Sequence, residues 1–352
     1  MHSAIADAAR LAEARIATHQ RLVSARPLLS PRVAAALLYV PRHPFLPGAG
    51  AARSGAGGAA WPEAAARVDP PLAEADLLDA LDVRPGHRVL HVGTGSGYTT
   101  ALLAWLTRPA SVTGTDVCAQ RLARARERLA GIGYRPLLTR AAPTEGHPER
   151  GPYHRVLAHH PVPRLPRAWL TQCLPGALLA APVAGALAVL QVTADGTAAG
   201  RLLPSPAESV GSLSGSPSPQ DPPVPTPPAG TGSDGWPAMV RRTEVPGGVL
   251  GDPAFAFFAQ LHLGGAALTA HPPTVVARDG SRARVTDRTV TVTGQRDLWA
   301  VVERAHTRWL ALHRPRREWF EIHVTGRRQW IGYRTPDGTE HTWDLPADPR
   351  PR

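Results

Sequence analysis

The first two hundred residues alternate between apolar positions at helical spacing and short runs that are almost entirely apolar. Ile5, Leu11 and Ile16 recur on one helical face within residues 3–26, and this period predicts an amphipathic helix. The run Val89–Val92 is typical of a buried strand. Because such helices and strands follow each other in turn, the pattern predicts a parallel, doubly wound α/β sheet. The predicted helices cover 3–26, 31–39, 73–81, 99–108, 119–129 and 166–173, and the predicted strands cover 89–92, 111–115, 155–158 and 177–181.

The longest apolar run extends from Leu174 to Val192. Proline and glycine interrupt it at Pro175-Gly176, Pro182 and Gly185. A membrane-spanning helix needs about 20 apolar residues without such breakers. The run therefore predicts two strands of the sheet joined by a turn, and we expect no membrane association.

The chain changes character at residue 204. Residues 204–237 consist mostly of Ser, Pro, Gly and Thr, a composition that buries too little apolar surface to fold and predicts a disordered linker. Residues 238–352 contain a helix with an apolar, Trp-rich stripe over Asp297–Leu312, which we expect in a core. The later apolar runs 319–324, 329–334 and 341–345 predict a meander with a turn at 336–338. We therefore expect a first domain over 1–203, a linker over 204–237 and a smaller α+β domain over 238–352 that helps to recognise a substrate.

Net charge, the distribution of arginines and the number of cysteines indicate which binding partners and which cellular compartment to expect. The 352 residues carry a net charge of +11, and all 39 basic residues are Arg. Because these arginines are spread along the chain without interleaved aromatic residues, we expect no nucleic-acid partner. The 2 cysteines have no disulfide or metal-binding spacing, and the charged, helical N-terminus does not resemble a signal peptide. These features predict a cytoplasmic protein and leave its oligomeric state open.

A glycine-rich turn follows the predicted strand Val89–Val92. Gly93, Gly95 and Gly97 have GxGxG spacing, and a helix is predicted directly after them, so its free N–H groups can meet a polar ligand. This spacing favours S-adenosylmethionine over NAD. Asp116 ends the next strand, nineteen residues after Gly97, where a carboxylate can accept hydrogen bonds from both ribose hydroxyls of either cofactor. The alternative is a tight strand-to-helix turn that binds no ligand.

The first domain carries distinctive short motifs: VPRHPFLP at residues 40–47, the glycine turn within VLHVGTGSGY at 89–98, GPYH at 151–154 and LPGA at 174–177. With these motifs it resembles the protein-L-isoaspartate O-methyltransferase family. Residues 40–47 are similar to the family's VPRHxFxP segment, and the glycine turn is similar to its VLEIGTGSGY motif. Residues 151–154 are similar to APYD, and 174–177 to LKPGG. The resemblance covers roughly residues 30–192 and implies a Rossmann-like S-adenosylmethionine methyltransferase sheet. It also implies methyl transfer to an aspartyl or isoaspartyl carboxylate of a protein or peptide. Such an acceptor is already an anion, so the reaction needs alignment rather than a general base.

The resemblance also assigns roles to individual positions. His91 stands where the family has an acid, Ala142 where it has the Asp of a GDG motif, and His154 where it has the Asp of APYD. Asp69 faces the acceptor in place of a Ser, and its negative charge would oppose a carboxylate there. Arg42, His43 and Pro71 are implied on the substrate side. The residues implied to bind the cofactor are His91, Gly93, Thr94, Gly95, Gly97, Asp116, Val117 and Ala142.

These departures keep two other functions open. The chain could be a degenerate member that acts as a binding or scaffold protein, or a methyltransferase with a small-molecule or modified-peptide acceptor. An acceptor that carries an amine would tolerate Asp69 better than a carboxylate would. His159 and His160 follow a predicted strand at the edge of the sheet where ligands bind, and with His147 and His154 they match no familiar metal spacing. We therefore expect no metal and interpret these residues as loop histidines.

Overall fold

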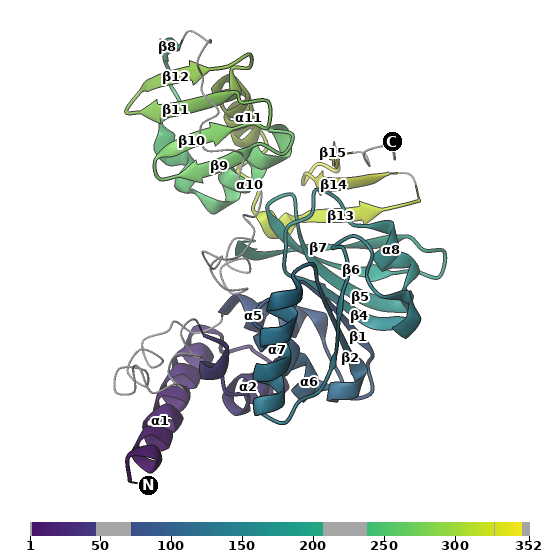
Figure 1. The fold of residues 1–352 in the computed structure, drawn as a ribbon. Helices are drawn as coiled ribbons and strands as arrows, with labels where there is room; N and C mark the ends of the chain where they lie inside the picture. Colours follow the sequence, from purple (N-terminus) through teal and green to yellow (C-terminus); the bar gives the residue numbers. More distant parts are fainter. Residues whose placement is uncertain (1, 47–71, 207–237, 327, 347–352) are drawn as a thin grey trace.

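The computed structural model describes residues 2–46, 72–206, 238–326 and 328–346, which form two β-sheets with helices packed against them (Figure 1). None of the helices in these ranges combines the length and hydropathy needed to cross a membrane. The helices are α1 (His2–Ala25), α2 (Pro31–Tyr39), α5 (Leu72–Leu81), α6 (Tyr98–Leu106), α7 (Ala119–Gly131), α8 (Arg167–Thr171), α10 (Pro253–His262) and α11 (Leu298–Ala311), with 3-10 turns η1 (His43–Phe45), η2 (Pro109–Ser111), η3 (Pro148–Arg150), η4 (Gly247–Gly251) and η5 (Arg317–Trp319).

The larger sheet has 10 strands in the order β15-β14-β13-β7-β6-β5-β4-β1-β2-β3. The five strands from β3 to β5 are parallel, and the remaining pairs are antiparallel. This arrangement confirms the predicted doubly wound α/β fold. The strands are β1 (Val89–Val92), β2 (Val112–Asp116), β3 (Leu137–Arg140), β4 (Tyr153–Ala158), β5 (Cys173–Val183), β6 (Ala186–Val192), β7 (Ala198–Pro206), β13 (Phe320–Val324), β14 (Gln329–Arg334) and β15 (Glu340–Asp344).

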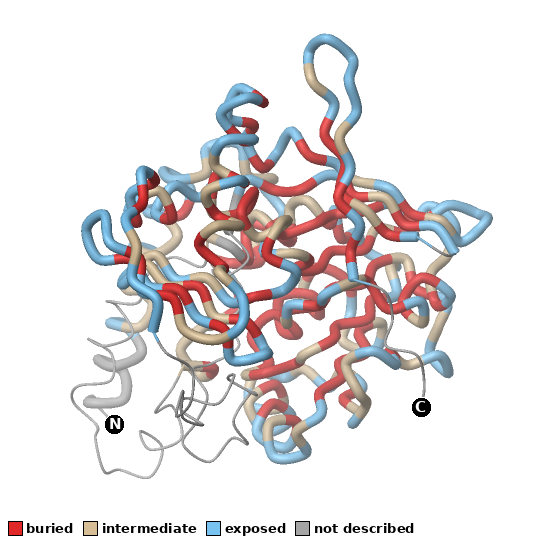
Figure 2. Tube along the Cα trace, turned by 90° about the horizontal axis from the view of Figure 1, so that it is seen from above, coloured by how far each residue is buried: buried red, intermediate tan, exposed pale blue. Residues whose placement is uncertain are grey.

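Both faces of the parallel strands are covered. All four residues of β1 are buried, but alternate side chains join different hydrophobic clusters, because successive side chains point to opposite faces. Val89 packs with residues of α2, α5, α6 and α7, whereas Leu90 and Val92 pack with residues of α8 and of the C-terminal part of the chain. Figure 2 shows buried backbone concentrated in the centre of the molecule and exposed backbone around its outside. The long apolar run 174–192 forms β5 and β6, joined at Ala184-Gly185, as predicted.

The C-terminal meander belongs to the larger sheet, which corrects the expected boundary at residue 238. β13 pairs with β7, and Ile322 lies opposite Gly200. β14 and β15 extend the same sheet (Figure 1). The physical reason is that β7 would otherwise leave its backbone N–H and C=O groups unpaired at a sheet edge. Residues 204–206, expected in a linker, are the end of β7, and the rest of that predicted linker, 207–237, lies outside the described residues.

The smaller sheet is antiparallel, in the order β8-β12-β11-β10-β9. Its strand β11 alternates exposed and buried side chains along its length, as expected for a sheet with one face in a core. The apolar stripe of α11 covers that core, and Trp299 and Trp309 are buried there, which confirms their structural role. The strands are β8 (Met239–Arg242), β9 (Ala267–Ala270), β10 (Pro273–Val276), β11 (Arg282–Thr286) and β12 (Thr289–Thr293).

Aromatic side chains join the two sheets. Phe258 of α10 lies edge-on to Trp343 of β15, with ring centroids 5.5 Å apart, and the Trp343 Nε1–H donates to His262 Nε2 at 3.1 Å. The buried Arg317 donates to the carbonyl of Pro204 at the end of β7 and to that of Pro253 at the start of α10. One continuous hydrophobic cluster therefore runs from β1 through the larger sheet into the smaller one.

Candidate functional site

Three parallel strands end side by side at one edge of the larger sheet. β1 lies between β2 and β4, and Val92 is in register with Thr115 and Ala158. The chain leaves β1 towards β2 on one side and returns to β4 on the other. Ligands of doubly wound sheets bind at such a reversal, outside the carboxyl ends of the strands. The glycine turn follows β1 at this point.

The backbone of the glycine turn is held against the end of β2. The N–H groups of Gly93 and Thr94 both donate to the carbonyl of Thr115, at 2.8 and 2.9 Å. Gly93 and Gly97 have φ of 87° and 93°, a region that favours glycine. A Cβ at Gly97 would lie 3.2 Å from the Cβ of Ala125 on α7. Gly97 therefore allows α6 to start with its free N–H groups close to the end of β1.

Asp116 ends β2 beside this turn, and its side chain is buried. Its Oδ2 accepts from the N–H of Gly95 at 3.1 Å. Its Oδ1 accepts from the N–H of Cys118 at 2.9 Å and from Nη2 of Arg121 at 3.0 Å. The structure thus brings the predicted glycine turn and the predicted acid together through a direct hydrogen bond.

The two other predicted positions near Asp116 lie at its side. Val117 follows Asp116 and is 44% exposed, an unusual degree for an apolar side chain. The backbone N–H of Ala141 donates to the carbonyl of Asp116 at 3.3 Å, which brings the next residue, Ala142, to the same edge. Val117 and Ala142 therefore lie at the same edge of the sheet as Asp116.

His91 occupies a different place from the one expected of a residue that contacts the cofactor. It is fully buried within β1, and its Nδ1 and Nε2 lie 2.8 Å from Thr100 Oγ1 and His159 Nδ1. Burial, together with the neighbouring His159 and His160, holds the pKa of His91 well below its usual value. Both ring nitrogens are therefore already used inside the protein.

His159 and His160 lie at the same edge, in the loop after β4, as the sequence analysis expected. They follow the end of β4, and His159 is 5% exposed. Burial lowers the pKa of His159 to about 4, with a further contribution from His160. Burial also lowers the pKa of His160, opposed by Asp116. Their position directly after a predicted parallel strand placed them at this edge in the sequence analysis, which did not predict the burial of His159.

His154 lies elsewhere. It is the second residue of β4, near the opposite end of the strand from Ala158. Its Nδ1 accepts from the backbone N–H of Arg88, and its ring stacks on His87. The replacement of an acid by His154 therefore does not alter the edge that carries the glycine turn. Asp69 and Pro71 lie outside the described residues.

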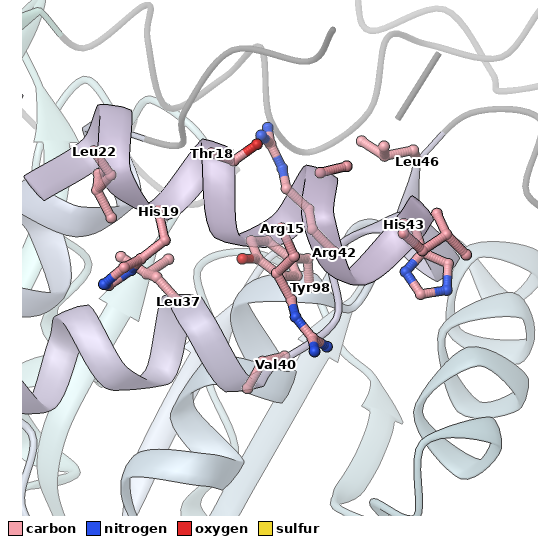
Figure 3. A pocket seen from close by; sticks show the side chains of 12 residues that line it. Arg15, Thr18, His19, Leu22, Leu37, Val40, Arg42, His43, Leu46 and Tyr98 are labelled. Carbon is pink, nitrogen blue, oxygen red and sulfur yellow. The ribbon is translucent and has the colours of Figure 1, made fainter. Parts of the chain in front are cut away.

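Arg42 and His43 line a pocket next to the glycine turn (Figure 3). α1 contributes Arg15 and His19 to it, and Tyr98, the first residue of α6, contributes its ring. The Arg42 guanidinium lies 5.8 Å from the centre of that ring. Among the described residues, those that line the pocket are basic, polar or apolar and include no carboxylate, so this part of the pocket suits an anion.

Glu74 is a further ionisable residue of this region that the sequence analysis did not identify. It lies on α5 and is 2% exposed, and its Oε2 has no hydrogen-bond partner among the described residues. Burial raises the pKa of the Glu74 carboxyl to about 8, opposed by the charge of Arg42 and a hydrogen bond with Thr99. The available signal was an acid placed between two alanines, Ala73 and Ala75, in a run that continues into the apolar pair Leu77-Leu78. The described residues contain no group of three or more His, Cys, Asp or Glu side chains placed to hold a metal ion.

Comparison with known proteins agrees with this geometry. Residues 17–201 match the family model Protein-L-isoaspartate(D-aspartate) O-methyltransferase (PCMT). A protein-L-isoaspartate O-methyltransferase of Methanopyrus kandleri is 34% identical over 170 residues, which are 47% of this chain and 74% of that protein. One of Aeropyrum pernix is 30% identical over 203 residues, which are 54% and 76% of the two chains. A solved protein-L-isoaspartate O-methyltransferase structure covers 93% of this chain and 98% of its own, with a TM-score of 0.49 and 14% identity.

The match includes the glycine turn, Asp116 and every parallel strand of the larger sheet. The chain therefore belongs to the protein-L-isoaspartate(D-aspartate) O-methyltransferase family, whose members are S-adenosylmethionine-dependent methyltransferases acting on isoaspartyl residues of proteins.

Proposed function

We propose that this chain binds S-adenosylmethionine at the carboxyl edge of β1, β2 and β4 and methylates an isoaspartyl or aspartyl carboxylate of a protein or peptide. The observation that carries the proposal is the direct hydrogen bond between the glycine turn and Asp116 at the reversal of the sheet. Gly93, Thr94, Gly95 and Gly97 would form the backbone cradle of the cofactor. Val117 and Ala142 would lie beside its base.

Asp116 fits the ribose of the cofactor by its acceptor capacity. Each carboxylate oxygen offers two lone-pair directions, and Oδ2 uses one of them for the N–H of Gly95. Oδ1 is occupied by Cys118 and Arg121. The Arg121 side chain is 27% exposed, so it can swing outward. We expect this movement to release the second acceptor direction that two ribose hydroxyls require.

The residues near Arg42 would position the acceptor. When bound, the cofactor supplies an electrophilic methyl group on a positively charged sulfur. An acceptor carboxylate is already ionised, so the protein needs to align it and exclude water rather than remove a proton. Arg42 provides the positive charge. Because its pKa is about 8, Glu74 is mostly protonated at pH 7 and adds little negative charge beside the acceptor.

A binding protein without methyl transfer is the second candidate. It is favoured by the ion pair between Arg121 and Asp116, with Nη2 and Oδ1 3.0 Å apart, which occupies the predicted ribose acceptor. We place either activity in the cytoplasm, in line with the free thiols of Cys118 and Cys173, and expect neither nucleic acid nor membrane as partner. The smaller sheet would help to hold the acceptor protein.

Calorimetric titration with S-adenosylhomocysteine tests the cofactor site. Asp116→Ala removes the ribose acceptor and should weaken binding by about 2 kcal/mol or more, roughly thirtyfold. Asp195→Asn is the matched control, because Asp195 lies in the exposed hairpin turn between β6 and β7. Absence of binding to the unmodified chain would refute the enzyme proposal and leave a protein that has kept only the fold.

Methyl transfer to three otherwise identical peptides tests the acceptor. The peptides carry isoaspartyl, L-aspartyl or an amine-bearing residue at one position. We expect transfer to a carboxylate peptide, and we expect Asp69→Ser to increase it, since the substitution removes a like charge. If transfer occurs only to the amine-bearing peptide and Asp69→Ser reduces it, the acceptor class is different. Cofactor binding without transfer to any peptide would support the binding-protein candidate.

A further inference from the structure

Three histidines form a chain of contacts beneath the glycine turn. His91 Nδ1 lies 2.8 Å from Thr100 Oγ1, and His91 Nε2 lies 2.8 Å from His159 Nδ1. The rings of His91 and His159 are nearly perpendicular, at 82°. His160 follows directly, and a Cβ built on Gly93 would lie 3.2 Å from its Nδ1. The imidazole of His160 therefore lies against the backbone of the predicted cofactor cradle.

This chain of contacts determines what His159 can offer to a ligand. A neutral imidazole has one donor nitrogen and one acceptor nitrogen. If His91 donates to His159 Nδ1, then His159 Nε2 carries a proton and is a donor. If His159 donates to His91 instead, His159 Nε2 is an acceptor, and His91 donates to the Thr100 hydroxyl. Whether His159 Nε2 is a hydrogen-bond donor or an acceptor therefore depends on whether His91 Nε2 carries a proton.

Nε2 of His159 and Nε2 of His160 are buried, and neither has a partner at hydrogen-bond geometry within the described part of the chain. The backbone of Gly93, in the glycine turn, interacts with the His159 side chain and opposes the lowering of its pKa. An unpaired buried polar atom costs about 1–3 kcal/mol, so proteins leave few of them without a ligand or water. Here two occur together at the edge of the sheet where doubly wound folds bind ligands. Among the described residues, no group of three or more His, Cys, Asp or Glu side chains is placed to hold a metal ion.

We propose that Nε2 of His159 and Nε2 of His160 bind the amino-acid end of S-adenosylmethionine, with His91 as the positioning residue. The proposal rests on the proposed cofactor site. An α-ammonium donates hydrogen bonds and an α-carboxylate accepts them, so this end of the cofactor satisfies either polarity of the two nitrogens. Because burial keeps the histidines neutral, they add no positive charge beside the cofactor's sulfonium.

Two ligands distinguish an effect on the amino-acid end of the cofactor from an effect on the rest of the cofactor site. S-adenosylhomocysteine carries the amino-acid end, whereas 5′-methylthioadenosine keeps the nucleoside and lacks that end. His159→Asn keeps an amide near the position of Nδ1, facing His91, and removes Nε2; His160→Asn removes the second nitrogen. We expect each variant to bind S-adenosylhomocysteine about tenfold more weakly in calorimetry and 5′-methylthioadenosine as the unmodified chain does.

The positioning role of His91 has its own test. His91→Gln keeps a polar atom near Nε2, and His91→Leu removes it. We expect His91→Leu to weaken S-adenosylhomocysteine binding and to spare 5′-methylthioadenosine, and His91→Gln to restore most of the lost affinity. A merely structural role would change the affinity for both ligands together, and this result would overturn the positioning role.

Other outcomes would overturn the proposal in distinguishable ways. Unchanged affinity for S-adenosylhomocysteine in both asparagine variants would show that the histidines do not touch the cofactor. If the KM for the acceptor peptide rose at the same time, the two nitrogens would belong to the acceptor site. Equal losses for both ligands would show a general disturbance of the edge. If the unmodified chain bound neither ligand, the proposed function itself would fail together with this inference.

Discussion

The buried carboxyl of Glu74 makes a quantitative prediction about stability. Glu74 lies on α5 with 2% of its surface exposed, and burial raises its pKa from 4.5 to about 8. Glu74→Gln removes the titrating group and keeps the size and the polar character of the side chain. The substitution should therefore stabilise the protein at alkaline pH and have little effect under acidic conditions.

The magnitude follows from proton linkage. Between pH 4.5 and 8 the folded state holds a proton on Glu74 that the unfolded state has lost, so stability falls by about 1.4 kcal/mol per pH unit. The favourable contribution of the protonated carboxyl is complete below pH 4.5 and disappears as the pH rises towards 8. Relative to low pH, where the carboxyl is protonated in both states, Glu74 therefore lowers the free energy of unfolding by less than about 1 kcal/mol at pH 5 and by about 4 kcal/mol at pH 8.

Urea denaturation of both proteins at pH 5 and pH 8 measures this effect. The stability gained by Glu74→Gln should be about 3.5 kcal/mol larger at pH 8 than at pH 5. Glu127→Gln on α7 is the matched control, because that carboxyl is exposed to water in the folded protein. An equal gain at both pH values would refute the reasoning, since it would mean that Glu74 carries the same charge in the folded and unfolded states.

Two further substitutions test the packing of the larger sheet. The buried side chain of Gln329 in β14 accepts from the N–H of Leu165, which follows β4, at 2.9 Å and donates to its carbonyl at 2.8 Å. Gln329→Leu should therefore lower the free energy of unfolding, measured by urea denaturation, by about 2–4 kcal/mol. A loss below about 1 kcal/mol would show that water replaces these hydrogen bonds. A Cβ at Gly200 in β7 would lie 1.9 Å from the carbonyl oxygen of Val189. Gly200→Ala should therefore lower the unfolding free energy by about 3 kcal/mol or more, whereas Gly248→Ala, which meets nothing within 4 Å, should not; equal effects would refute the steric argument.

The parts of the site that depend on local sequence were predictable. GxGxG spacing between a buried strand and a helix requires the positive φ found at Gly93 and Gly97. Asp116 could be placed because its strand pairs directly with the one before the turn. The alternation of apolar runs likewise indicated the parallel strands, with the exception of β3, whose residues are only partly buried.

The features that the sequence did not reveal are non-local. From the sequence, His91 was expected to face a ligand. In the structure its Nε2 instead lies 2.8 Å from Nδ1 of His159, a residue 68 positions later in the chain. The pairing of β13 with β7 joins residues more than a hundred positions apart, and a run of alternating residues does not name its partner strand. Glu74 was missed because its charge state depends on how completely α5 is covered by its neighbours.

The position of β13 to β15 has a consequence for how the chain can be divided. Everything between β7 and β13 is an insertion at the place of a hairpin turn, because Arg201 and Glu321 lie opposite each other on antiparallel neighbours (Figure 1). A cut near residue 204 would leave β7 as an open edge, a template for aggregation. During synthesis on the ribosome β7 is also an open edge for a time, because β7 is synthesised well before its partner β13. A shortened gene that keeps the catalytic sheet should instead join residue 203 to residue 319 through a short turn.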